Sequence, residues 1–360
     1  MPIPHLRFLD LFKAVAANLI VLHHLAFYGP MSDHVRPVLP GVIEWLDQHA
    51  RIAVQVFLAV GGFLAAKSLS NGQAGPSHPL RAILRRYAKL APPFIAAMAG
   101  AVAANAVASL WMTHESISAP PTLAQFAAHA LLLHGLLGVE SLSAGAWYVA
   151  IDFQLYALLT VLLCTAARGG RFRWLAPLLV TTAAAASLYY FNRDASWDNW
   201  ALYFIGSYGL GALAWYASDR HRHMTGAALI VAVITLLGVT SLALDFRIRI
   251  AVALATSLAL VALSRGALRL PGQDLGLTSW LGRISYGIFL MHFPVSLVVN
   301  ALFTRFTPAE TAWQASGMLV AWMASIAAGD AFHRWVEVPL GALLRASPAR
   351  EDAVRSRPFA

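Results

Sequence analysis

"KAVAANLIVLHH", residues 13–24, decides the fold, because it joins an apolar run to a cation at one end and two imidazoles at the other. The run belongs to an apolar segment of about twenty residues that starts at Phe8, long enough to cross a bilayer as a helix. No small-residue cleavage site follows it, which indicates a retained helix rather than a signal peptide. Ionisable groups at membrane depth are costly, so those in this segment are functional candidates.

The whole chain has the composition of a membrane protein. Of its 360 residues, 59% are hydrophobic and 12% are charged, whereas soluble domains carry about 25% charged residues. The single cysteine, Cys164, excludes an intrachain disulfide and a cysteine zinc cluster, and no metal site is predicted. The net charge of +9 is interpreted as a signal of membrane topology, and no nucleic-acid partner is expected.

The apolar pattern predicts an all-α fold, a polytopic membrane helical bundle of about ten transmembrane helices. The predicted spans are residues 8–28, 52–68, 91–112, 148–166, 174–191, 200–217, 225–243, 249–264, 281–303 and 313–334.

An eleventh apolar stretch, 123–138, is predicted to be a re-entrant or peripheral helix. A crossing there would move the arginines of 168–173 to the outer side. Without it, most of the 26 Lys and Arg residues lie in connections on one side, which places the N and C termini in the cytoplasm. We expect one transmembrane domain over 1–340 and a basic cytoplasmic tail over 341–360.

Lys13 and His24 are eleven residues apart, so an α-helix places them on one face with about 16 Å of rise between them. The helix offers a cation near the cytoplasm and a titratable base toward the outer side. Alternatively, Lys13 extends to the inner headgroups and His24 bonds a neighbouring helix.

A second group of cations lies in "RAILRRYAKLAPPF", residues 81–94, which we interpret as a cytoplasmic loop. Its cations, with no acid between them, are Arg81, Arg85, Arg86 and Lys89. Guanidinium groups match phosphate oxygens, so the segment suits a phosphorylated ligand. An ordinary positive loop against anionic lipid headgroups is the alternative.

Three further ionisable residues lie in or near later spans. Asp152 shares a helical face with Tyr156 and either orients or charges a histidine on another helix, or anchors the helix end at the interface. His292 precedes Pro294 by two residues, and packing at a kink is at least as good an interpretation as catalysis. Glu337 is expected to pair with a nearby arginine.

Taken together, these stretches resemble the integral-membrane acyltransferase family three, O-acyltransferases that decorate cell-surface polysaccharides and lipids. The first segment is similar to the family's opening helix, with Lys13 and His24, but not His23, at the family's spacing. Gly61 stands where the family usually has serine, and Asp152 stands in place of a glutamate. The arginine-rich segment, "LGRISYGIFLMHFPV" and the segment from Glu337 to Pro339 also resemble family motifs.

The resemblance implies transfer of an acyl group, most often acetyl, from cytoplasmic acyl-CoA to a hydroxyl of an extracytoplasmic carbohydrate or glycolipid. It implies a multi-pass protein of the inner (plasma) membrane, in contact with membrane lipids and with no permanently bound cofactor. Lys13 and the four cations of 81–89 become candidates for binding the phosphates of CoA. His24 becomes the catalytic base or a transient acyl carrier, and Asp152 the group that orients or charges it.

The main alternative is a ten-span proton-coupled transporter or flippase, with His24, Asp152 and His292 as a proton relay. It requires an inverted repeat, and no such symmetry is found in the sequence. A scaffold without activity leaves Lys13 and His24 unexplained.

Overall fold

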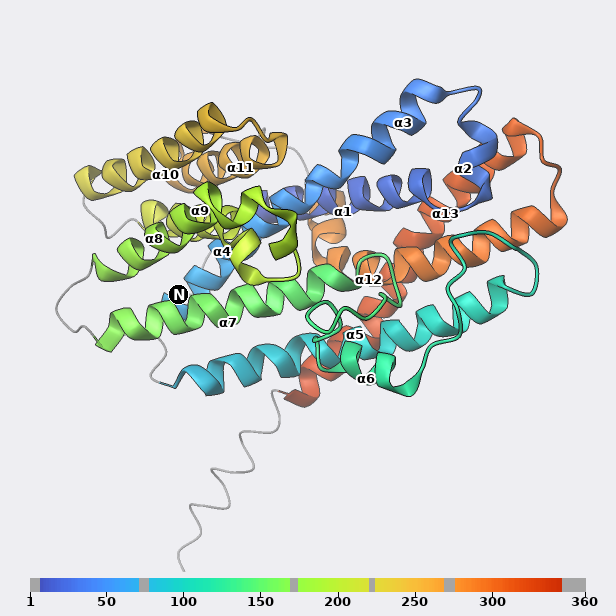
Figure 1. Ribbon diagram of the computed structural model, residues 1–360, viewed down its shortest axis with the longest axis horizontal. Helices are drawn as coiled ribbons and strands as arrows, with labels where there is room; N and C mark the ends of the chain where they lie inside the picture. The colour runs from blue at the N-terminus through green and yellow to red at the C-terminus, as the bar shows by residue number, and fades with distance from the viewer. Residues whose placement is uncertain (1–6, 71–77, 169–173, 220–223, 269–275, 345–360) are drawn as a thin grey trace, which may run out of the picture. The chain divides into compact units, whose positions relative to one another are not determined.

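The computed structural model describes residues 7–70, 78–168, 174–219, 224–268 and 276–344 (Figure 1). Within these residues every regular element is a helix, which confirms the all-α prediction. Among them, 8 segments are long and apolar enough to cross a membrane, so the chain is a polytopic membrane protein. They are α1 (Arg7–Phe27), Pro40–Ser70, α5 (Pro79–Ala108), α7 (Ala146–Arg168), α10 (Met224–Leu244), α11 (Ile248–Arg265), α12 (Gly276–Phe306) and Thr311–Leu344.

Two of these segments contain more than one element. Pro40–Ser70 comprises α3 (Pro40–His49), a short 3-10 turn and α4 (Ala53–Ser70). Thr311–Leu344 begins with α13 (Thr311–Phe332), which is followed by a π turn.

The other two predicted spans correspond to α8 (Leu175–Tyr189) and α9 (Ala201–Ser218). α8 has 15 residues, fewer than a spanning helix usually needs. The total of ten spans and the cytoplasmic termini remain predictions. So does the division into a domain and a basic tail, and residues 345–360 of that tail lie outside the described residues.

α5 differs most from its prediction. It begins at Pro79 rather than at residue 91, so the arginine-rich segment forms the first turns of this helix and is not a loop. Proline suits a first helical turn because its missing N–H has no partner to lose there. The arginines and lysines that follow are good helix formers.

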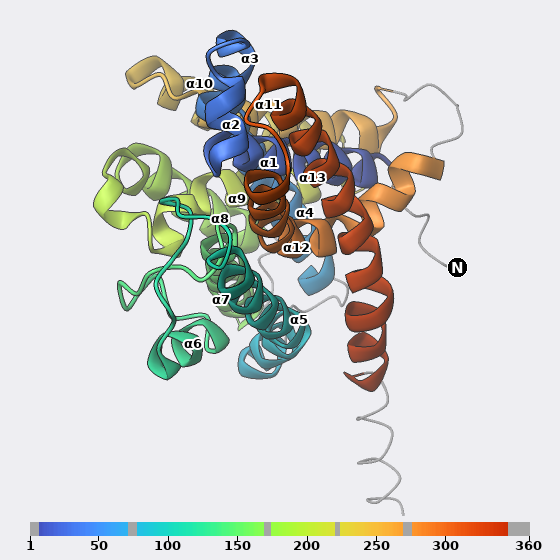
Figure 2. The ribbon, with the colours of Figure 1, turned by 90° about the vertical axis from the view of Figure 1, so that its right-hand side faces the viewer.

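The stretch 123–138 does not form a spanning helix. α6 (Leu123–Ala130) has 8 residues and starts at a capping box between Thr122 and Gln125. It lies beside α5, where the Tyr87 hydroxyl donates a hydrogen bond to the carbonyl of Ala130 at 2.8 Å (Figure 2).

The chain forms two compact units, and α1, α3, α5, α7 and α12 each contribute residues to both. Unit 1 comprises Met1–Ile20, His49–Ile83 and Ala150–Arg283, and unit 2 comprises Val21–Gln48, Leu84–Val149 and Ile284–Ala360.

α9 is the centre of unit 1, where it packs against α4, α8, α10 and α11 (Figure 1). Glycines let it approach α4. A Cβ atom at Gly62 would lie 1.9 Å from the carbonyl oxygen of Tyr208, and one at Gly211 would lie 1.9 Å from the carbonyl oxygen of Ala59. Small residues at such crossings allow close backbone packing in a membrane.

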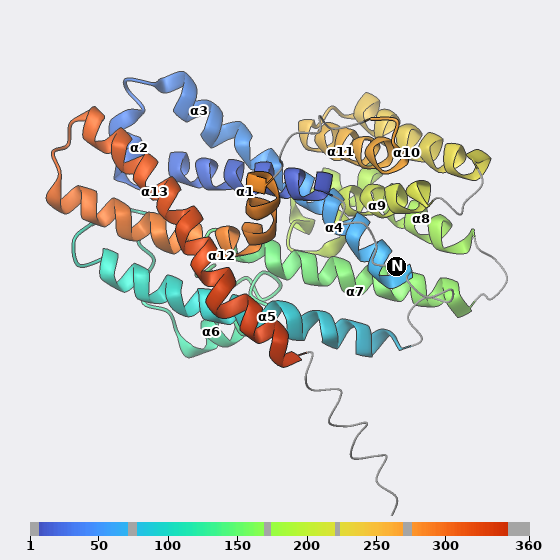
Figure 3. The same cartoon turned by 180° about the vertical axis from the view of Figure 1, so that it is seen from behind.

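In unit 2, α13 crosses α12 (Figure 3). A Cβ atom at Gly287 would lie 2.4 Å from the carbonyl oxygen of Gly329, so these glycines set the crossing point. After α13 the helix widens into the π turn His333–Glu337.

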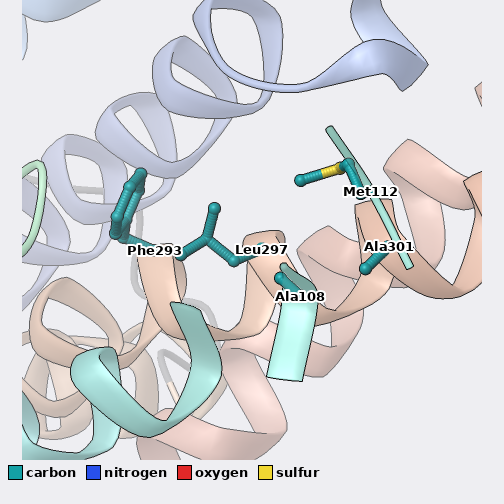
Figure 4. Close-up of a cluster of buried hydrophobic side chains, with 5 residues drawn as sticks. All are labelled: Ala108, Met112, Phe293, Leu297 and Ala301. Carbon is teal, nitrogen blue, oxygen red and sulfur yellow. The ribbon is translucent and has the colours of Figure 1, made fainter. Parts of the chain in front are cut away.

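The end of α5 also packs on α12 in unit 2 (Figure 4). The buried cluster there is Ala108, Met112, Phe293, Leu297 and Ala301.

Gly211→Ala is expected to destabilise the protein by about 1–3 kcal/mol or more, because the added methyl meets backbone of α4 rather than a movable side chain. Gly100→Ala is the matched control, since nothing lies within 4 Å of a Cβ atom at that position of α5. The control should gain up to about 1 kcal/mol from the lower helix cost of alanine. Thermal unfolding of the detergent-purified variants measures both changes in stability. Equal shifts in Tm for the two variants would contradict the close crossing of α9 and α4.

Candidate active site

Two buried histidines meet in unit 2. His24 of α1 and His292 of α12 are 9% and 1% exposed, and His24 Nδ1 lies 2.6 Å from His292 Nε2. The ring planes differ by 7° and the ring centroids are 4.9 Å apart. Nitrogens of stacked rings cannot approach as closely as 2.6 Å, so the rings lie edge to edge and share a hydrogen bond.

The backbone of α12 decides which nitrogen of the pair carries each proton. His292 Nδ1 lies 2.7 Å from the carbonyl oxygen of Phe289, and a carbonyl only accepts, so Nδ1 of His292 is the donor. In the neutral ring, His292 Nε2 is then an acceptor, and His24 Nδ1 must donate to it. The same reasoning leaves His24 Nε2 with a lone pair. This nitrogen is therefore able to take a proton.

His23 has a different role from its neighbour. Its Nδ1 lies 3.1 Å from the carbonyl oxygen of Leu46, so it joins α1 to α3. The two adjacent imidazoles thus form hydrogen bonds to different helices, His23 to α3 and His24 to α12.

The chain that follows α1 is also tied to α12. The Met31 amide donates to the side-chain oxygen of Asn300 at 3.1 Å. Gly29, with φ of 95°, lies so close to Asn300 that a Cβ atom there would be 2.3 Å from the same oxygen. This tie holds the end of α1, and with it His24, against the helix that carries His292.

Lys13 lies in unit 1 and has an acidic partner one turn earlier. Its Nζ is 2.8 Å from Asp10 Oδ1, and the two side chains are 25% and 1% exposed. Gly282 of α12 allows this site to close, because a Cβ atom there would lie 2.5 Å from Asp10 Cα. The carboxylate of Asp10 therefore balances the charge of Lys13, and the ammonium group keeps further N–H donors for a ligand.

Asp152 also lies in unit 1, 7% exposed, and faces α4 and α9. A Cβ atom at Gly61 would lie 3.4 Å from Asp152 Oδ1 and 3.2 Å from Cε2 of Tyr208. A serine at position 61 would accordingly reach this carboxylate. His24 belongs to unit 2, so its pairing with Asp152 remains a prediction.

The cations of the arginine-rich segment lie on the first turns of α5. Arg81, Arg85 and Lys89 are exposed, and their spacing of four residues places them along one helical face. Arg86 is half-buried beside this face.

Among the described residues Glu337 pairs with a histidine and with no arginine, contrary to the prediction. Its Oε2 lies 2.9 Å from Nδ1 of His333, within the π turn. The nearest arginine in sequence, Arg334, is 65% exposed and pairs with Asp330 at 2.8 Å.

Sequence reasoning selected His24 but missed Asp10, and it left His292 between packing and catalysis. Asp10 had a visible signal, because it precedes Lys13 by three residues, the spacing of a helical ion pair. The partner of His24 had none, since 268 residues separate the two histidines.

A buried histidine pair with a nitrogen able to take a proton, inside a polytopic helical bundle, defines an integral membrane protein equipped for acid–base chemistry. The family model described as "Acyltransferase domain" matches residues 6–329, and the chain belongs to this family, the third acyltransferase family. The protein is thus a multi-pass membrane acyltransferase. No curated protein and no solved structure matches the chain.

Asp10→Asn is expected to cost about 3 kcal/mol of folding stability, because it leaves the partly buried Lys13 ammonium without its counter-charge. Adding Lys13→Met should recover most of this loss. Arg334→Ala breaks an exposed pair and should cost at most about 1 kcal/mol. Chemical denaturation of the purified variants tests the ranking, and a double variant no more stable than Asp10→Asn would show that the two charges are not coupled.

Proposed function

We propose that the protein transfers an acyl group, which we take to be acetyl, from cytoplasmic acyl-CoA to a hydroxyl of an extracytoplasmic carbohydrate or glycolipid. It would act as a multi-pass enzyme of the inner (plasma) membrane. Family membership supports the acyl transfer, and the donor, the acceptor and the membrane are part of this proposal.

One observation carries the role of His24. The hydrogen-bonded series from the Phe289 carbonyl through His292 to His24 leaves His24 Nε2 unprotonated in the neutral state. A general base needs a lone pair on a ring of fixed orientation. The series supplies both features, in the same way that a carboxylate orients the histidine of a serine protease.

In the proposed reaction the acceptor hydroxyl attacks the thioester carbonyl of acyl-CoA. The new O–C bond forms, the C–S bond breaks, and the hydroxyl proton moves to His24 Nε2. The departing thiolate then takes this proton and leaves as CoA thiol. His292 accepts a hydrogen bond from His24 Nδ1 throughout, which stabilises the transient imidazolium.

The phosphates of CoA are assigned to Lys13 and to the cations of α5, Arg81, Arg85, Arg86 and Lys89. CoA is too polar to cross a bilayer, so its phosphates should be held at the cytoplasmic ends of the helices. The rise of about 16 Å between Lys13 and His24 along α1 suits an extended pantetheine arm.

In this proposal Asp152 is a buried negative charge that stabilises the protonated form of His24. Because His292 already orients the ring of His24, we assign Asp152 the electrostatic role rather than the orienting one.

The transporter alternative uses the same histidines as a proton relay, but family membership favours the transferase. The two hypotheses predict different behaviour with acyl-CoA. A transferase consumes it, whereas a proton-coupled transporter does not react with it.

His24→Gln is expected to abolish transfer, a loss of at least about 100-fold for removal of a general base. His23→Gln is the matched control, because the Nδ1 atom of His23 pairs with the Leu46 carbonyl of α3, and this variant should retain most of the activity. Thiol release from acetyl-CoA by purified protein, with and without a cell-envelope carbohydrate extract, provides the measurement. Near-normal release by His24→Gln would remove His24 from the mechanism.

Arg85→Ala is expected to raise the KM for acetyl-CoA about tenfold, the loss of one charge-assisted contact, with little change in kcat. Arg305→Ala, which removes an exposed arginine from the last turn of α12, should leave this KM unchanged. An unchanged KM in both variants would assign the α5 cations to lipid headgroups instead.

A further inference from the structure

His134 is a buried imidazole that the proposed mechanism does not use. It lies in the turns after α6 and is 1% exposed, and neither of its ring nitrogens has a hydrogen-bond partner among the described residues. Buried polar groups are nearly always paired, so a histidine with two unpaired nitrogens needs an explanation.

The ring of His134 is held in place by its neighbours rather than by its own hydrogen bonds. It lies parallel to the ring of His129, with centroids 4.0 Å apart and planes 6° apart, and beside the ring of Phe94 at 6.3 Å. His129 is itself fully bonded, because its Nδ1 donates to the Gln125 carbonyl at 2.8 Å and its Nε2 accepts from the Leu142 amide at 3.1 Å. His129 therefore serves as a rigid support.

The backbone that presents His134 is strained. Leu132, two residues earlier, has φ of 59°, and among the described residues it is the one non-glycine residue with positive φ. Leucine rarely adopts this conformation, and such strain concentrates at functional sites. The strain and the unpaired ring are independent observations on the same turn.

His134 lies near the level of the histidine pair within unit 2. α5 and α12 run side by side, since the Tyr286 hydroxyl donates to the Leu90 carbonyl at 3.3 Å, and Ala108 and Ala301 belong to one buried cluster further along (Figure 4). On α5, Phe94, the neighbour of His134, lies between these two contacts. On α12, His292 lies between them as well.

Burial and the neighbouring His129 lower the pKa of His134 to about 4, so the ring is neutral at physiological pH. A neutral imidazole offers one N–H donor and one acceptor nitrogen. A hydroxyl group both accepts and donates, and a sugar presents such groups next to each other. The unpaired donor and the unpaired acceptor of His134 therefore complement a carbohydrate rather than an anion.

We propose that His134 binds a hydroxyl-bearing carbohydrate acceptor and positions it for reaction at His24. This assignment rests on the proposed function, and it gives the turn after α6 a role in acceptor recognition. His134 is a binding residue here and takes no part in proton transfer.

The test replaces His134 by phenylalanine, which keeps a flat ring against His129 and Phe94 but removes both nitrogens. Because no hydrogen bond is lost, His134→Phe should keep or raise the Tm. The amount of carbohydrate extract needed for half-maximal stimulation of thiol release should rise at least tenfold, while the KM for acetyl-CoA stays within twofold. His134→Gln, which retains a donor and an acceptor, should recover part of the difference.

His129→Phe is the control for packing. It leaves the Leu142 amide and the Gln125 carbonyl without their partner, so it should lower the Tm, unlike His134→Phe. An acceptor requirement of His134→Phe within twofold of wild type would overturn the proposal, as would a rise in the KM for acetyl-CoA alone.

A wild type that releases no thiol would overturn the proposed function and this assignment together. If wild-type thiol release is not stimulated by the extract, the carbohydrate part of both proposals fails, while the transferase reading stands.

Discussion

The hydrogen bond between His24 and His292 is the constraint on which the rest of unit 2 depends. Two imidazoles buried inside a bundle require partners, and each finds the other only if α1 and α12 lie side by side at one rotation. The tie between Met31 and Asn300 fixes that arrangement just beyond the end of α1. The carbonyl of Phe289 then sets the protonation of the whole series, so a backbone atom determines which nitrogen is available for chemistry.

Helix contacts in a membrane gain little from the hydrophobic effect, because lipid tails are as apolar as leucine. The crossings here are accordingly built on glycine, at Gly62 and Gly211 in unit 1 and at Gly287 and Gly329 in unit 2. Close backbones place polar side chains within reach of one another. The same close packing that stabilises the bundle thus makes room for buried ionisable groups.

Hydropathy alone predicted most helices to within a few residues, since the bilayer imposes a length and an apolar composition on each span. The start of α5 was not predictable in this way, because its first turns are charged although they are helical. His24 could be selected from its spacing to Lys13, whereas its bond to His292 depends on the rotation of two helices far apart in sequence. Glu337 was expected beside an arginine, but Arg334 pairs with Asp330, and His333 is the partner of Glu337.

The widening of the helix after α13 has a consequence for how the chain tolerates change. A π turn such as His333–Glu337 holds one residue more than a regular α-helical turn, and the surplus is absorbed locally. A relative that has lost one residue here would keep α13 and its glycine crossing intact. Only the side chains after Val338 would rotate to a new direction, so the C-terminal segment is able to vary in evolution without disturbing the membrane helices that precede it.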